Sequence, residues 1–109
     1  MAISTIKQTA NNSENGYCKM PDGTLIQWGA IGGYEGVKRK DYTITFPIAF
    51  DTSYTYVMTA NGRFFSDANS YETVCTCRIE SATQAIVHVY NASSNYTNAI
   101  FWVAVGRWK

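Results

Sequence analysis

The amino-acid sequence predicts an all-β domain, a small antiparallel β-sandwich, and two features of its composition carry that prediction. The chain of 109 residues holds 7 Val, 9 Ile and 12 Thr but a single leucine, and aromatic residues make up 15% of it. β-Branched and aromatic side chains suit the half-buried surface of a sheet, whereas they lose rotamer freedom in a helix. A chain of this size buries roughly two-thirds of its unfolded surface, which is enough for one core but not for two domains.

Turn signals and alternating apolar residues divide the first half of the chain into strands. The turn at residues 21–23, Pro-Asp-Gly, separates residues 16–19 from residues 24–28, which predicts a first hairpin. In the next predicted strand, residues 41–46, the alternation directs three side chains inward: Tyr42, Ile44 and Phe46. A further strand is predicted over residues 54–60.

The second half of the chain is predicted to hold a second hairpin and a closing strand. Residues 73–80 and 84–91 form the hairpin, and one of its faces is expected to carry Cys75, Cys77, Ile79, Ile86, His88 and Tyr90. The closing strand, residues 99–106, is apolar on both sides, with Phe101, Val103 and Val105 on one and Trp102 and Ala104 on the other. Because the outer face of an antiparallel sandwich is normally wet, we expect another copy of the chain to cover it. Cover by loops of the same chain is the alternative.

Residues 1–15 are mostly small and polar, and they stand apart from the predicted sandwich, residues 16–109. The spacing of Ile3, Ile6 and Ala10 allows a helical turn at the end of a stalk, and a flexible N-terminal segment is the alternative.

Charge and sequence motifs exclude several classes of partner and chemistry. With 9 Lys+Arg against 8 Asp+Glu, the net charge of +1 gives no field that would recruit nucleic acid. No segment reaches the roughly 18 apolar residues of a membrane helix, so we expect no membrane insertion, and residues 1–16 lack the apolar stretch of a signal peptide. His88 is the single histidine, and no nucleophile motif accompanies it, so we assign no catalytic residue and expect a protein that is not an enzyme.

The three cysteines, Cys18, Cys75 and Cys77, are expected to be reduced thiols. Cys75 and Cys77 stand two residues apart on one predicted strand, a spacing that suits neither a disulfide nor a tetrahedral zinc site. We therefore expect no metal and no cofactor, and the role of the thiols stays open.

Two polar loops supply the candidate ligand-binding residues. Residues 61–71 and 91–98 mix aromatic rings with short amides and hydroxyls. Sugars are recognised by this mixture, because the apolar face of a pyranose packs on an aromatic ring while amides pair with its hydroxyls. The alternative is that the rings cap the core and the amides solvate turns. The candidates are Arg63, Phe64, Phe65, Asn69, Tyr71, Asn95 and Tyr96.

Three blocks of sequence occur in a fixed order: GYCKMPDGTLIQWG at residues 16–29, ITFPIAF at residues 44–50 and NAIFWVAVGR at residues 98–107. Together they resemble the C-terminal head domain of tail fibre proteins from tailed bacteriophages and prophages. The resemblance implies a β-sandwich at the distal tip of a homotrimeric virion fibre, assembled in the bacterial host cytoplasm, with residues 1–15 as the end of the fibre shaft. It also implies structural roles for Gln27, Trp28, Phe46, Pro47, Phe50 and Trp102.

The leading hypothesis is therefore a receptor-binding domain of a phage tail fibre. It would attach to a bacterial cell-surface polysaccharide or another receptor without catalysis. Two alternatives stay open at this point, namely a polysaccharide depolymerase that uses a carboxylate pair and a structural cap that trimerises the fibre.

Overall fold

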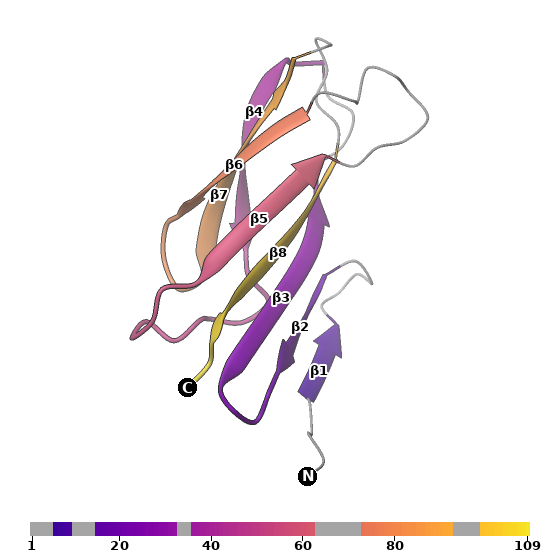
Figure 1. The fold of residues 1–109 in the computed structure, drawn as a ribbon. Coiled ribbons are helices and arrows are strands. Elements are labelled where there is room, and N and C mark those ends of the chain that lie inside the picture. Colours follow the sequence, from indigo (N-terminus) through magenta and orange to yellow (C-terminus); the bar gives the residue numbers. More distant parts are fainter. Residues whose placement is uncertain (1–5, 10–14, 33–35, 63–72, 93–98) are drawn as a thin grey trace.

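The computed structural model describes residues 6–9, 15–32, 36–62, 73–92 and 99–109. Within them it contains strands and no helix, and therefore no helix that is long and apolar enough to cross a membrane. In chain order the described strands are β1 (Ile6–Thr9), β2 (Gly16–Lys19), β3 (Thr24–Ile31), β4 (Arg39–Thr45), β5 (Val57–Gly62), β6 (Thr73–Ile79), β7 (Gln84–Asn91) and β8 (Ile100–Arg107). All pairings are antiparallel, in one sheet of order β1-β2-β3-β8-β5 and another of order β4-β7-β6 (Figure 1). The predicted all-β class is confirmed.

The core lies between the two sheets and is formed by alternate residues of their strands. The inward prediction for β4 and the residue after it is confirmed, since Tyr42, Ile44 and Phe46 are all buried. From the other sheet, the indole of Trp102 meets the ring of Phe46 edge-on, with centroids 5.5 Å apart. Phe46 makes similar contacts with two further buried rings, Phe50 and Tyr56. These aromatic contacts join the two layers.

A fully buried glutamine ties the five-stranded sheet to the segment that follows β4. The side-chain amide of Gln27 donates a hydrogen bond to the carbonyl oxygen of Ile48 at 2.9 Å, and its oxygen accepts one from the N–H of Ile48 at 3.0 Å. Both polar groups of the side chain are therefore satisfied, as buried amides require. The structural role expected for Gln27 is confirmed, whereas Trp28 faces the outside of its sheet.

Three predicted elements can be compared directly with the structure. The first hairpin is confirmed, and its turn places Gly23 at a φ of +102°, which favours glycine. The strand predicted from residue 54 begins three residues later, because Tyr54 donates its N–H to the carbonyl of Asp51 in a turn. Ile6–Thr9 form a strand paired with β2 and not a helical turn. The division at residue 16 stays a prediction.

The β6–β7 hairpin is confirmed, but its predicted face was wrong by one residue. Cys75 lies opposite Val89 on the inner side, and Thr76 lies opposite His88 on the outer side. The turn sets this register, because the N–H groups of Glu80 and Ser81 both donate to the carbonyl of Gln84. Since the side-chain period of a strand is two, a shift of one residue exchanges the two faces. His88 therefore points away from the core.

The long connections leave the sandwich at one end, which we call the loop end. Ile31 of β3 and Gly62 of β5 both pair there with Ile100 of β8. Thr73, which begins β6, lies against Gly62. The pairing of Ile6 with Lys19 and the described C-terminus lie at the opposite end (Figure 1). The candidates Arg63, Phe64, Phe65, Asn69, Tyr71, Asn95 and Tyr96 lie outside the described residues, in segments whose flanking strands end at the loop end.

Candidate functional site

The outer face of the five-stranded sheet is apolar across three of its strands. One row of directly opposed residues consists of Ile26, Val105 and Val57, and the next contains Trp28 and Val103. Phe101 follows on β8. We call these six residues the apolar face. Val57 is 67% exposed, Phe101 48% and Val105 38%.

The two-sided apolar pattern predicted for the closing strand is confirmed. Trp102 and Ala104 are buried between the sheets, while Phe101 and Val105 face outward. These two outer side chains are exposed, so the described part of the chain does not cover them. An apolar patch of this kind on a small domain is typical of a protein interaction surface.

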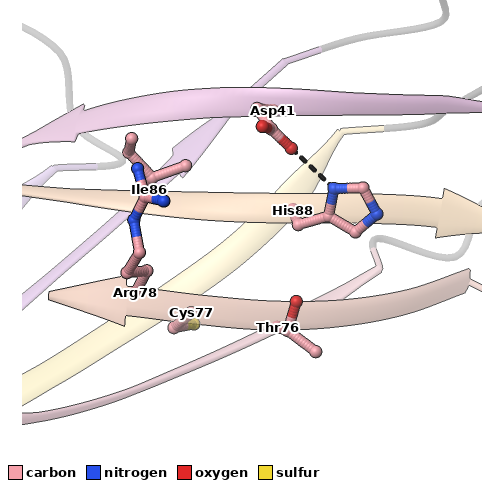
Figure 2. A pocket seen from close by; sticks show the side chains of 6 residues that line it. All are labelled: Asp41, Thr76, Cys77, Arg78, Ile86 and His88. Carbon is pink, nitrogen blue, oxygen red and sulfur yellow. Dashed lines mark hydrogen bonds and ion pairs between the residues drawn. The ribbon is translucent and has the colours of Figure 1, made fainter.

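The outer face of the three-stranded sheet is polar and slightly hollowed. Asp41, His88 and Thr76 form a row across β4, β7 and β6. The carboxylate oxygen Oδ1 of Asp41 lies 2.6 Å from Nδ1 of His88, within hydrogen-bonding distance (Figure 2). A hollow of about 270 Å³ surrounds this pair, and we call it the polar hollow; its lining residues are Asp41, Thr76, Cys77, Arg78, Ile86 and His88.

Charged groups border the polar hollow on two sides. Arg78 of β6 forms an ion pair with Glu80, which follows the last residue of that strand. Beyond His88 along β7 lies Tyr90, whose ring is 4.9 Å from the Arg39 guanidinium and 5.6 Å from Lys38 Nζ. Exposed ion pairs and cation–π contacts each contribute at most about 1 kcal/mol to stability. Their effect here is to hold long side chains in place around the hollow.

The geometry of the hollow suits binding better than nucleophilic catalysis. A serine-type relay needs a hydroxyl within roughly 2.6–3.2 Å of the second histidine nitrogen. In Figure 2 the imidazole of His88 turns that nitrogen away from the hydroxyl of Thr76. The same side chains do present a carboxylate acceptor and guanidinium donors around Ile86, an apolar residue.

The thiols of β6 lie on the inner side of this sheet, away from the imidazole. Burial, with a smaller effect of the neighbouring Cys77 thiol, raises the pKa of Cys75 to about 11. Burial also raises the pKa of Cys77. Cys18 lies in the other sheet, and all three cysteines are free. Among the described residues no three His, Cys, Asp or Glu side chains gather in a group that could hold a metal ion.

The polar hollow was not expected from the sequence, because the predicted faces of the hairpin put His88 on the same side as the thiols. One local signal pointed the other way. Val87 and Val89 flank His88, and two valines at this spacing predict an inward face that excludes the histidine between them. Ile86 obscured that signal because it is apolar and faces outward.

The comparisons with known proteins connect this fold to tail fibres. None of the curated proteins matches the chain significantly. A solved structure of the P. aeruginosa R1 pyocin fibre is similar with a TM-score of 0.70 and 24% identity over 96% of this chain and 28% of that chain. An N-truncated R1-type pyocin tail fibre gives a TM-score of 0.66 and 24% identity over 93% of this chain and 85% of that one. A P. aeruginosa R2 pyocin fibre gives a TM-score of 0.67 and 22% identity over 94% of this chain and 26% of that chain.

The chain therefore spans little more than a quarter of the length of the first of these fibre structures. At sequence identities of this size, the similarity concerns the fold. The family model described as "Putative tail fiber protein gp53-like, C-terminal" matches residues 19–107, which include most of the first sequence block and all of the other two. The resemblance stated from the three blocks is confirmed, and the chain belongs to this family of tail fibre C-terminal domains.

Proposed function

We propose that this domain is the receptor-binding tip of a homotrimeric tail fibre and attaches to a bacterial cell-surface glycan without catalysis. The observation that carries the proposal is the separation of two surfaces on one small sandwich. The apolar face lies along the side of the five-stranded sheet, whereas the strands that flank the candidate loops end at the loop end. One surface is thus suited to assembly, and another stays open for contact.

The apolar face favours assembly into a trimer. Val57 lies on β5 at the edge of its sheet, and Phe101 and Val105 lie on the neighbouring strand. Their exposure in water is unfavourable by about 25 cal/mol for each Å² of apolar surface. Packing of three copies around a common axis, each presenting this face, removes that surface from water. Membership of a tail fibre family favours this occupant over an unrelated protein.

The two ends of the sandwich favour a position at the tip of the fibre. Residues 6–9 lie at the end opposite the loop end, so a shaft joined through the preceding residues leaves the loop end pointing away from it. The candidate loops hold aromatic rings and amides that suit sugars. Three copies on one fibre raise the effective concentration of sites, so single-site affinities of about 1 mM are sufficient for firm attachment.

Binding to cells tests this proposal. Light scattering should give three chains per particle, and the fluorescently labelled protein should stain one or more strains of a bacterial panel in flow cytometry. Periodate, which cleaves the vicinal diols of sugars, should abolish the staining, and no new reducing ends should appear. The quadruple variant Phe64→Ala, Phe65→Ala, Tyr71→Ala and Tyr96→Ala should lose staining while it remains a trimer.

The matched control is Ile79→Ala, which removes an exposed apolar side chain of the opposite sheet that lines neither surface and should leave staining unchanged. Staining that survives periodate would show that the receptor is not a glycan. Released reducing ends would establish depolymerase activity instead, and full staining by the quadruple variant would remove the candidate loops from the proposal.

A further inference from the structure

We propose that the polar hollow on β4, β7 and β6 is a second saccharide site, on the side of the domain, that binds a neutral pyranose through neighbouring hydroxyls. The choice of a sugar as ligand rests on the proposed function. The site itself follows from the residues of an outer sheet face that contains none of the candidate loop residues. It is also separate from the apolar face, so trimer assembly leaves it accessible.

The acceptor side of the hollow is already oriented. Asp41 and His88 stand directly opposite each other on adjacent strands, and their side chains meet at 2.6 Å. The two side chains are nevertheless 65% and 44% exposed, so a ligand can reach both. A carboxylate has about four lone-pair sites, and one hydrogen bond leaves acceptors for two adjacent hydroxyls. Because the pair holds both groups in place, binding costs less side-chain entropy.

The donor side of the hollow lies on β6. Two pairs of outward-facing residues follow each other along β6 and β7. Thr76 lies opposite His88, and Arg78 lies opposite Ile86. The Arg78 guanidinium offers five N–H donors in a planar fork, and the ion pair with Glu80 limits its motion. Thr76 adds a hydroxyl at the border of the hollow (Figure 2). Sugar hydroxyls both donate and accept, so they match an acceptor on one side and donors on the other.

The floor and the size of the hollow fit a sugar ring. Ile86 lies between the donor and acceptor strands and gives the C–H face of a pyranose an apolar contact. The volume of about 270 Å³ is close to the lower limit of about 300 Å³ for small-molecule sites.

The charge of the hollow favours a neutral ligand over an anion. Asp41 lies in the hollow itself and Glu80 lies beside Arg78, so an anionic group would meet a carboxylate on either side. The cations Lys38 and Arg39 are engaged over the ring of Tyr90. The expected ligand is therefore a neutral hexopyranose unit of a glycan.

An NMR titration tests the lateral site on the isotope-labelled protein in its native oligomeric state. The probes are the methyl pyranosides of glucose, galactose and mannose at millimolar concentrations, which together present cis and trans vicinal diols. At least one probe should shift the amide signals of residues 41, 76, 78, 86 and 88. Asp41→Asn and Arg78→Gln should each weaken that probe's binding about tenfold, as expected when a charged hydrogen-bonding partner is lost.

The control variant is Thr45→Ala, which removes an exposed hydroxyl from β4 outside the hollow and should leave the titration unchanged. An unchanged spectrum with all three probes overturns the proposal, as does unchanged binding by both variants. Shifts confined to the loop end, near Ile31, Gly62 and Ile100, also overturn it while leaving the proposed attachment through loops intact. Staining that survives periodate, together with shifts at the hollow, would instead remove the proposed glycan receptor and keep the lateral site.

Discussion

The two sheets of this sandwich are alike on their inner faces and opposite on their outer ones. β8 and β7 bury similar apolar side chains between the layers, such as Ile100 and Val87. On the outside, β8 presents Phe101 and Val105, whereas β7 presents His88 beside a carboxylate. The inner faces are therefore alike, whereas the two outer faces differ in chemistry, one of them apolar and the other polar.

The largest expected effect comes from placing a charge on the apolar face. Val105 pairs with Ile26 on one side and Val57 on the other, so Val105→Asp puts a carboxylate at the centre of the proposed trimer contact. An uncompensated buried charge costs about 3–5 kcal/mol when one partner of an ion pair is missing. In the proposed trimer, three such carboxylates would meet at the axis. Sedimentation velocity should show monomers at micromolar concentration.

The matched change on the polar face is Thr43→Asp, which adds the same charge at an exposed position of β4 and should leave the oligomer intact. A Val105→Asp protein that still sediments as a trimer would show that the apolar face is not the contact surface.

A smaller effect is expected in the layer that both sheets share. Gln27→Met keeps the volume of the side chain but leaves the N–H and the carbonyl of Ile48 without the side-chain partners they have in the structure. Unsatisfied buried groups cost about 1–3 kcal/mol each, and because Ile48 is only half-buried the free energy of unfolding should fall by about 2–4 kcal/mol. Urea denaturation at equal protein concentration measures this loss.

Gln84→Met is the control for that measurement, because the Gln84 side chain is exposed and should change stability by less than about 0.5 kcal/mol. Equal losses in the two variants would mean that the contact with Ile48 adds nothing to stability.

The smallest effect concerns pH and the inner side of β6. Burial raises the pKa of Cys75 from 9.0 to about 11, so the folded protein favours the protonated thiol. The resulting contribution to stability is fully present below pH 9.0 and is lost as the pH rises toward about 11. Cys75→Ala should therefore lose less stability than the wild-type protein across this interval, as measured by urea midpoints. A control variant, Cys18→Ala, changes a cysteine of the other sheet, and parallel curves for Cys75→Ala and wild type would contradict the prediction.

Much of the fold follows from local sequence patterns. The turn before Thr24 contains a proline and a glycine, whose backbone preferences favour a turn. The alternation of buried apolar and exposed polar side chains through Tyr42 and Ile44 is uninterrupted. The predicted hairpin bounds give the observed pairing of β6 with β7, but its faces did not follow, because Ile86 is apolar and yet faces outward. Local pattern thus predicts elements better than it predicts which of their faces is buried.

The candidate surfaces were predictable to different degrees for the same reason. β8 showed from its own residues that both of its faces are apolar, but Ile26 and Val57 join the apolar face only once the strand order is known. The polar hollow combines Asp41 and Arg78, which are far apart in the sequence and come together across β7. A surface made by strands that are distant in the chain has no local signature.

The central position of β8 has a consequence for synthesis of the protein. β8 lies between β3 and β5, so until residues 100–107 are made β5 has no partner in this sheet and β3 pairs only with β2. Until those residues emerge from the ribosome, the nascent chain keeps two unpaired strand edges and the apolar half of its core open to water. A chain that stops before residue 100 would lack the strand that joins β3 to β5 and could not complete the sandwich.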